Sequence, residues 1–296
     1  NPNETLTNTT TAPITVRYIY TLAANGCTNP VTFNVDVVVN PMPALTSSLT
    51  PPAICSGSVF SYTPTSATAG TSFGWTRASV AGITPAGPTS GTDNPNETLT
   101  NTTTAPITVR YVYTLTANGC TNPVTFNVDV VVNPMPTLTS SLTPPAICSG
   151  SAFSYTPTSA TAGTSFGWTR ASVAGIAPAG PASGTGDPNE TLTNNTTAPI
   201  TVRYIYTLAA NGCTNPVTFN VDVVVNPMPT LTSSLTPPAI CSGSAFSYTP
   251  TSATAGTSFG WTRASVAGIT PAGPASGTDN PNETLTNTTT APITVR

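Results

Sequence analysis

Six cysteines are the most reactive side chains in this sequence, and their spacing limits the chemistry open to them. No two of them have the gap of a C-x-x-C motif and the chain has no His, so we expect no zinc site. Thiols in an oxidising compartment form disulfides instead. The disulfide candidates are Cys27, Cys55, Cys120, Cys148, Cys213 and Cys241.

Basic side chains are scarce in this chain of 296 residues: there is no Lys and no His, and all seven basic residues are Arg. A Ser or Thr nucleophile therefore has no His or Lys as its base, and no amine is available for covalent catalysis. A net charge of −3 also leaves no basic patch for nucleic acid or for an anionic membrane. We expect a protein that is not an enzyme and that binds no nucleic acid.

Carboxylates could still act in pairs, and the nearest neighbours are Asp93 with Glu97 and Asp279 with Glu283. At the equivalent place in the middle of the chain Gly186 replaces the Asp, so we interpret these groups as solvated loop charges. Calcium needs six to eight oxygen ligands, and ten widely spaced acids supply too few. We therefore expect neither a metal nor a cofactor.

The chain is a repeat with a period of 93 residues and no insertion or deletion, as three tryptophans at Trp75, Trp168 and Trp261 show. Both sets of cysteines keep the same period. A unit of this length is too long for a helical solenoid repeat and close to the roughly 100 residues of a self-contained β-sandwich. Each unit is expected to fold alone.

Domain boundaries are marked by an Asn-Pro-Met-Pro segment at 40–43, 133–136 and 226–229. Proline donates no ladder hydrogen bond and favours an extended residue before it, which describes a short, stiff linker. The predicted domains are a C-terminal part of a repeat at 1–40, complete repeats at 41–133 and 134–226, and an N-terminal part of a repeat at 227–296.

Alternating apolar residues predict two long strands at 107–115 and 124–132, joined through the hairpin-forming step Asn118-Gly119. Shorter strands are expected at 45–49, 59–63, 71–77 and 97–103, with a Gly/Pro-rich stretch at 81–95. Six or seven strands with a Trp on the third are typical of an immunoglobulin-like sandwich. Trp75, Trp168 and Trp261 are then expected to be core anchors, although an exposed Trp would stack on a sugar.

Three segments carry a resemblance to a known family: Ala146 to Tyr155, the Phe166-Gly167-Trp168 step, and Ala210 to Cys213. They resemble the PKD-like and immunoglobulin-like repeats of Bacteroidota surface proteins, and the resemblance extends over the whole chain. It implies an all-β fold of tandem PKD-like sandwiches within a giant secreted adhesin or filament, exported by the type 9 secretion route. The sorting domain of that route is not found in this sequence.

We expect the repeats to be structural extenders, stacked as a rod, of an extracellular surface adhesin or filament. Their partners are neighbouring repeats of the chain and, in a fibre, other copies of it. The sequence contains no run of about 18 apolar residues, so we expect no membrane insertion. The alternative is a multivalent, low-affinity binding module for polysaccharide or surfaces, with the Thr runs at 9–11, 102–104 and 288–290 as candidate platforms.

Two disulfide schemes fit the sequence. Within one domain, Cys55 would pair with Cys120, and Cys148 with Cys213. If the strands after Cys55 and before Cys120 run the same way, the two turns lie at opposite ends of the domain, beyond the roughly 7 Å that a disulfide spans. Cys55 would then pair with Cys213 of the next repeat, leaving Cys120 and Cys148 for domains outside this sequence. One strand fewer between Trp75 and Ile107 reverses this geometry.

Overall fold

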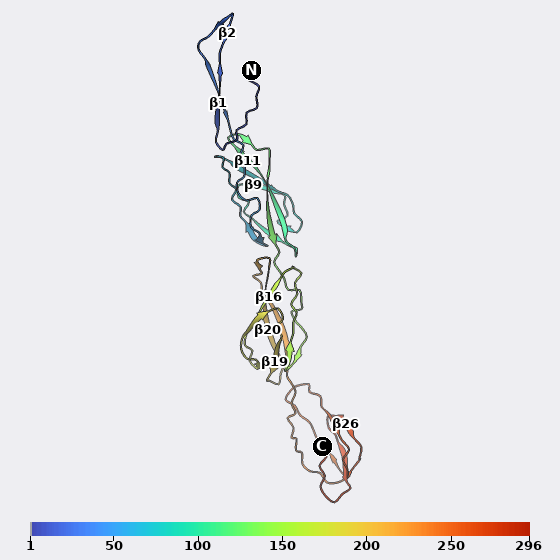
Figure 1. Cartoon of the computed structure of the whole chain (residues 1–296). Coiled ribbons are helices and arrows are strands. Elements are labelled where there is room, and N and C mark those ends of the chain that lie inside the picture. Colours follow the sequence, from blue (N-terminus) through green and yellow to red (C-terminus); the bar gives the residue numbers. More distant parts are fainter. Residues whose placement is uncertain (1) are drawn as a thin grey trace. The chain divides into compact units, whose positions relative to one another are not determined.

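The computed structural model describes residues 2–296, and all regular structure in that range is β-strand (Figure 1). Two compact units can be distinguished, each described here by itself. The first contains Asn1–Thr139, Thr158–Ser165 and Leu208–Pro216, and the second contains Ser140–Pro157, Phe166–Thr207 and Val217–Arg296. No helix long and apolar enough to cross a membrane occurs in residues 2–296.

Each full copy of the repeat supplies nine strands. In the first copy they are β5 (Ile54–Cys55), β6 (Ser58–Phe60), β7 (Ser72–Arg77), β8 (Ile83–Thr84), β9 (Thr89–Thr92), β10 (Glu97–Asn101), β11 (Ile107–Ala117), β12 (Cys120–Thr121) and β13 (Phe126–Asn133). In the second copy they are β14 (Ile147–Cys148), β15 (Ser151–Phe153), β16 (Ser165–Arg170), β17 (Ile176–Ala177), β18 (Ala182–Thr185), β19 (Glu190–Asn194), β20 (Ile200–Ala210), β21 (Cys213–Thr214) and β22 (Phe219–Asn226).

These strands form the two sheets of an immunoglobulin-like sandwich. One sheet has the order β5-β13-β11-β7-β9, with β12 added to β11, and the other has the order β6-β10-β8. The second copy repeats both sheets with β14 to β22. Neighbouring strands are antiparallel except for β5, which runs parallel to β13, and its equivalent β14, which runs parallel to β22. The predicted all-β sandwich class is confirmed.

The core is built from the alternation that predicted the strands. Along β11 the side chains of Val109, Tyr111, Tyr113 and Leu115 are fully buried. Successive side chains of a strand point to opposite faces, so the residues between them face outward. There Arg110 forms an exposed ion pair with Asp129 of β13, at 2.7 Å between Nε and Oδ1.

The tryptophan of β7 packs inside the sandwich. Trp75 is 6% exposed and lies edge-on to Tyr111, with ring centroids 5.4 Å apart. Its neighbour on β9 is Gly91, where an added Cβ would lie 2.6 Å from the indole ring. The indole therefore lies so close to β9 that a side chain at position 91 would collide with it.

Two local predictions differ from the structure. Residues 45–49 form no strand, because single hydrogen bonds such as Asp129 N to Leu49 O (2.8 Å) hold this segment without a continuous ladder. In the sheet that contains β13 and β11, the edge strand next to β13 is β5 instead. The Gly/Pro-rich stretch 81–95 contains β8 and β9, which are too short to produce a periodic pattern in the sequence.

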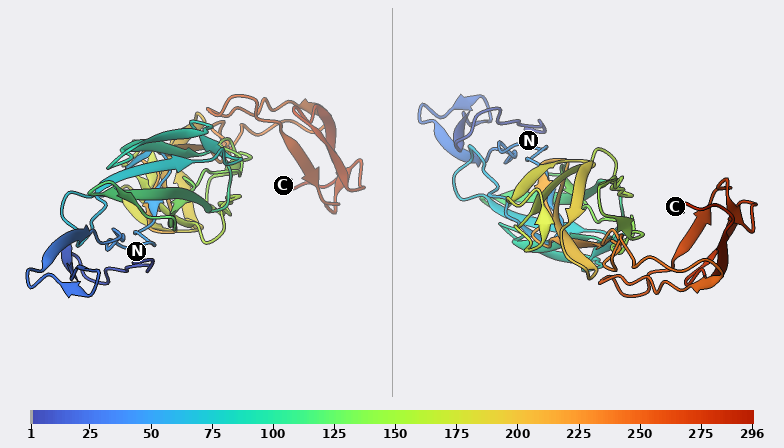
Figure 2. Two further views of the ribbon diagram at one scale, coloured as in Figure 1. Left: turned by 90° about the horizontal axis from the view of Figure 1, so that it is seen from above. Right: turned by 90° about the horizontal axis from the view of Figure 1, so that it is seen from below.

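At the two ends of the chain the structure has parts of the same sandwich. The N-terminal part consists of β1 (Ile14–Tyr20) paired with β4 (Phe33–Val39), and β2 (Ala23–Ala24) paired with β3 (Cys27–Thr28). The C-terminal part has a sheet of β23 (Ser244–Phe246), β27 (Glu283–Asn287) and β25 (Ile269–Thr270), and a sheet of β24 (Gly260–Arg263) and β26 (Ala275–Thr278). Figure 2 shows the N-terminal hairpin, in dark blue, with no second sheet packed on it.

Candidate functional site at a disulfide junction

A tight turn positions the cysteine that follows each long strand. After β20 the chain reverses at Asn211 and Gly212, whose φ angles are 52° and 77°. Asn and Gly tolerate this left-handed conformation better than other residues, and it matches the twist of a two-residue hairpin. The turn places Cys213 at the start of β21, where the cysteine is 2% exposed.

Cys213 forms a disulfide with Cys55, the last residue of β5. The two Cα atoms are 5.6 Å apart although 158 residues separate the cysteines in the sequence. Cys55 belongs to one copy of the repeat and Cys213 to the next. Of the two schemes that the sequence left open, the structure contains the bond between copies.

Two asparagine amides fix the linker beside the disulfide. Asn133 donates from Nδ2 to the carbonyl of Asn211 (2.9 Å), and Asn215 donates from Nδ2 to the carbonyl of Pro136 (2.8 Å). The carbonyl of Asn133 in turn accepts a hydrogen bond from the Ser56 backbone N–H (2.8 Å). Both ends of the Asn-Pro-Met-Pro segment are thereby bound to the two turns that carry the cysteines.

The same amide contacts recur at the preceding linker. Asn40 donates to the carbonyl of Asn118 (2.9 Å), and Asn122 donates to the carbonyl of Pro43 (2.8 Å). Cys120 occupies the position of Cys213 there but is free, as are Cys27, Cys148 and Cys241. The linker contacts therefore form with or without the disulfide.

The carboxylate of Glu97 is engaged inside the sandwich, and its interpretation as a solvated loop charge was wrong. Arg77, which is 1% exposed, donates to its two oxygens at 2.9 and 3.2 Å, and Tyr111 donates from its hydroxyl at 2.6 Å. Sequence spacing could not show this contact, because the three residues come from three strands. Asp93, the expected neighbour, lies instead in a turn with a φ of 56°.

The second copy contains the same buried pair, Arg170 with Glu190, and the third has Arg263 with Glu283. Burial alone would raise the pKa of Glu190, but hydrogen bonds from Arg170 and Tyr204 outweigh it and hold the pKa below its ordinary value. Both oxygens of this carboxylate are occupied. The arrangement stabilises the fold and offers no free acid or base.

Asp187 stands in the second copy where Asn94 and Asn280 stand in the others, and it takes over their role. Its carboxylate accepts hydrogen bonds from the Ser154 hydroxyl (2.6 Å) and the Tyr155 backbone N–H (2.7 Å). Burial raises its pKa, but these bonds together lower it below the ordinary value. This position is a turn brace rather than half of a catalytic pair.

The Thr run at 102–104, a candidate platform for polysaccharide, uses two of its hydroxyls in local hydrogen bonds. In the Thr run at 102–104, the Thr103 hydroxyl bonds to Asn101 Oδ1 (2.8 Å) and the Thr102 hydroxyl to the Gly82 carbonyl (3.1 Å). These hydroxyls already serve the local turn. Within residues 2–296 there is no group of three or more His, Cys, Asp or Glu that could hold a metal ion.

The tryptophans proposed as core anchors differ between copies. Trp75 and Trp168 are 6% and 7% exposed, while Trp261 is half-buried. Trp168 lies edge-on to Tyr204 at 5.5 Å, as Trp75 does to Tyr111. In the two full copies the ring is therefore covered and presents no face to a sugar.

The sheet order and the repeated junction agree with a match to the family model of the PKD-like domain, over residues 52–136 and 145–229. The chain belongs to the PKD-like domain family, whose members are generally non-catalytic structural modules. No curated protein matches the chain.

Among solved structures, three cadherins are similar to the chain at low TM-score. Human protocadherin-24 EC1-2 is 14% identical, with a TM-score of 0.32, over 63% of this chain and 98% of that one. Mouse cadherin-23 EC22-24 is 11% identical, with a TM-score of 0.27, over 73% and 74%. Drosophila N-cadherin EC1-4 is 10% identical, with a TM-score of 0.28, over 94% and 75%. These likenesses add nothing to the fold that the strand pairings define.

Proposed function

We propose that the chain is a segment of structural extender, or stalk, from a long extracellular bacterial surface adhesin or filament. The observation that carries this proposal is the disulfide between Cys55 and Cys213, which links one repeat covalently to the next. Domains that acted independently of one another would not need a covalent bond between them. A stalk transmits force along its length, and a covalent bond between neighbouring repeats would carry that force across their junction.

The junction resists extension in two ways. The amides of Asn133 and Asn215 bind the linker noncovalently, and hydrogen bonds of this kind contribute about 1 kcal/mol each. The disulfide holds even when such bonds break. A stable disulfide also indicates an oxidising compartment, which supports an extracellular location.

The domains of this stalk are proposed to be 41–133 and 134–226, with partial repeats at 1–40 and 227–296. The resemblance to Bacteroidota repeats supports export by the type 9 route and a place in a giant adhesin or filament. A polysaccharide-binding role is less well supported, since the Thr102 and Thr103 hydroxyls are engaged within their own turn.

Single-molecule stretching of the 296-residue chain, held at its two ends, tests the proposal. With free thiols alkylated first, the oxidised chain should keep the 158 residues between the bonded cysteines locked against extension. Reduction should then release them, adding about 520–570 Å of contour length at roughly 3.3–3.6 Å per residue. An equal contour length before and after reduction would show that the bond carries no load and would overturn the proposal.

A further inference from the structure

One asparagine contacts both turns that carry the bonded cysteines. The backbone carbonyl of Asn133 accepts a hydrogen bond from the N–H of Ser56, the residue after Cys55 (2.8 Å). Its side chain donates from Nδ2 to the carbonyl of Asn211, two residues before Cys213 (2.9 Å). Asn133 also lies opposite Cys55 in the parallel ladder of β13 and β5. As the last residue of β13, it is held in place by the sheet.

These contacts lie away from solvent. Asn133 and Ser56 are 8% and 9% exposed, and Cys213 is 2% exposed. Water competes little for a hydrogen bond in such surroundings, and the low local dielectric strengthens the bond. The amide of Asn133 is therefore suited to fix the distance between the two turns.

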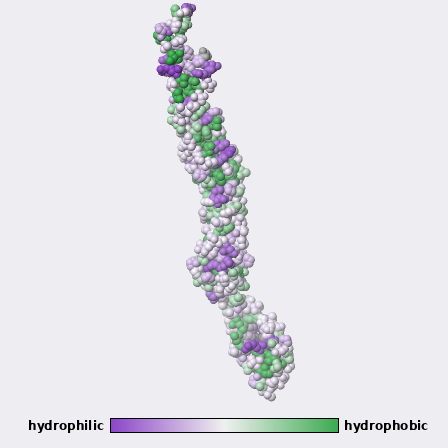
Figure 3. Space-filling model, viewed as in Figure 1, coloured by the Kyte–Doolittle hydropathy of each residue, from purple (hydrophilic) through white to green (hydrophobic). Residues whose placement is uncertain are grey.

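Charge contributes little to bringing these turns together. Only 6% of the residues are charged, and most of the surface in Figure 3 is pale, which marks intermediate hydropathy. The asparagines of the two turns are neutral, and so are the cysteines as long as their thiols are protonated. Alignment of the turns therefore depends on neutral hydrogen bonds.

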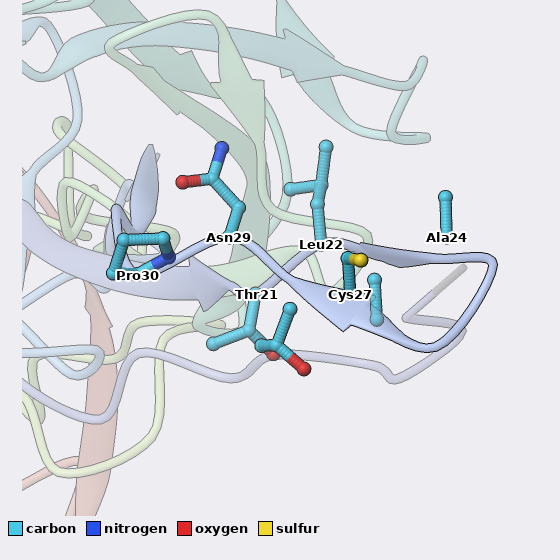
Figure 4. A pocket seen from close by; sticks show the side chains of 8 residues that line it. Thr21, Leu22, Ala24, Cys27, Asn29 and Pro30 are labelled. Carbon is cyan, nitrogen blue, oxygen red and sulfur yellow. The ribbon is translucent and has the colours of Figure 1, made fainter.

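The turn that presents the second cysteine keeps its shape when its thiol is free. Beside the disulfide, Asn215 donates from its backbone N–H to the Leu208 carbonyl (2.9 Å). The same bond closes the equivalent turn of the N-terminal part, from Asn29 to Leu22 (2.8 Å). Figure 4 shows Cys27 on that turn, where it carries a free thiol. The disulfide is therefore not what shapes the turn.

The amide contact between the turns is equally independent of the bond. At the preceding linker, Asn40 donates to the carbonyl of Asn118 at 2.9 Å. Cys120, which occupies the place of Cys213 there, is a free thiol. The hydrogen bond forms without covalent linkage, so the equivalent contact of Asn133 is available to two free thiols.

We propose that Asn133 is the positioning residue of this disulfide: its hydrogen bond to Asn211 holds Cys55 and Cys213 within bonding reach while both are still thiols. The two cysteines are 158 residues apart, and closing a loop costs conformational entropy that grows with its length. Asn133 offsets that cost before the sulfur atoms react, and it thereby selects Cys213 as the partner of Cys55. Because it concerns the same bond, this role rests on the proposed extender function.

The oxidant is a low-molecular-weight disulfide such as oxidised glutathione. One cysteine thiolate attacks a sulfur of the oxidant, forms a mixed disulfide and releases one reduced glutathione. The other thiolate then attacks the protein sulfur of the mixed disulfide and releases the second. The two cysteines lose two protons and two electrons, which leave with the two reduced glutathiones. Only the second step joins two parts of the chain, so only that step depends on Asn133.

Redox titration of the full chain tests the positioning role. Four substitutions leave only the bonded pair: Cys27→Ser, Cys120→Ser, Cys148→Ser and Cys241→Ser. The reduced chain is equilibrated with mixtures of reduced and oxidised glutathione and quenched with acid, and intact mass then separates the dithiol, the mixed disulfide and the disulfide. At a known concentration of reduced glutathione, the ratio of disulfide to mixed disulfide gives the effective concentration of one cysteine at the other.

Asn133→Ala should lower this effective concentration by about fivefold, the factor that one typical hydrogen bond supplies, and should raise the share of mixed disulfide. Asn40→Ala is the matched control, because it removes the same amide contact at the preceding linker. It should change the effective concentration by less than about twofold. A role confined to fold stability would lower the melting temperature without changing this ratio. Equal effects of the two substitutions, or no effect of either, would overturn the proposal.

Asn133→Asp decides the outcome if the alanine variant fails to fold. The carboxylate keeps the size of the side chain but has no N–H to donate to the Asn211 carbonyl, so the effective concentration should again fall. An unchanged value would overturn the positioning role and leave the extender function standing, because the bond would still link the two repeats. Equal contour lengths in the stretching experiment would overturn the extender function and leave the redox titration unaffected.

Discussion

At the scale of single residues, the few charged side chains of this protein include a buried ion pair between Arg170 and Glu190. Arg170 is 2% exposed, and its guanidinium donates to both oxygens of Glu190 at 2.9 Å. A bidentate pair of this kind adds geometric specificity as well as energy. Removing one partner leaves the other charge buried and uncompensated.

Glu190→Gln should therefore destabilise the second sandwich by about 3–5 kcal/mol, the usual cost of breaking a buried ion pair. Denaturant unfolding followed by tryptophan fluorescence measures the change. Asp222→Asn is the matched control, because its partner Arg203 lies on the surface with 56% of its side chain exposed. A loss for Glu190→Gln no larger than for the control would contradict the structural role of the pair.

Trp168→Ala should destabilise the same sandwich by about 3–5 kcal/mol, since it removes a large buried aromatic ring that contacts Tyr204. Urea unfolding monitored by far-ultraviolet circular dichroism gives the value. A loss well below that range would mean that the ring is exposed in solution and would favour sugar stacking.

At the scale of elements, the packing of the tryptophan depends on a glycine in the neighbouring strand, whose role has no sequence pattern. Gly184 of β18 pairs with Trp168 of β16 across the ladder. An added Cβ at Gly184 would lie 2.8 Å from the indole, closer than side chains approach in practice. The space that Gly184 leaves for the indole therefore depends on the pairing of β16 with β18.

Gly184→Ala should lower the stability of the sandwich by about 1–3 kcal/mol through overpacking against the indole. Gly180→Ala is the control, because a Cβ there meets nothing within 4 Å. Thermal unfolding of both variants should separate them by several degrees. Equal melting temperatures would show that the indole moves away without cost.

At the scale of the whole molecule, the pH dependence of stability follows from its few titrating groups. Glu190 and Asp187 have lowered pKa values, so their contribution is present above the unfolded pKa of about 4 and is lost as pH falls below it. Tyr204 has a pKa raised by burial and by its bond to Glu190, so its contribution is lost as pH rises above about 10.

The melting temperature should therefore be nearly constant between about pH 5 and 9 and should fall on either side of that window. Differential scanning calorimetry across the range measures it, at constant ionic strength. A change of more than a few degrees inside the window would contradict this expectation for a chain that has neither His nor Lys.

The sequence by itself determined the local elements and their repetition. The alternation along β11 and β13 and the Asn118-Gly119 step specify one hairpin because strand faces and turn conformation depend on neighbouring residues alone. The burial of Trp75 followed from the same alternation. These features recur every 93 residues, so the same local prediction holds for every copy of the repeat.

Tertiary structure decided what depends on residues far apart. The partner of Cys55 was set by the strand order, which places its turn beside a cysteine 158 residues away. Glu97 is held by Arg77 and Tyr111 from two other strands, so its spacing from Asp93 was uninformative. The parallel pairing of β5 with β13 likewise has no local pattern, because its energy comes from a strand more than 70 residues further along the chain.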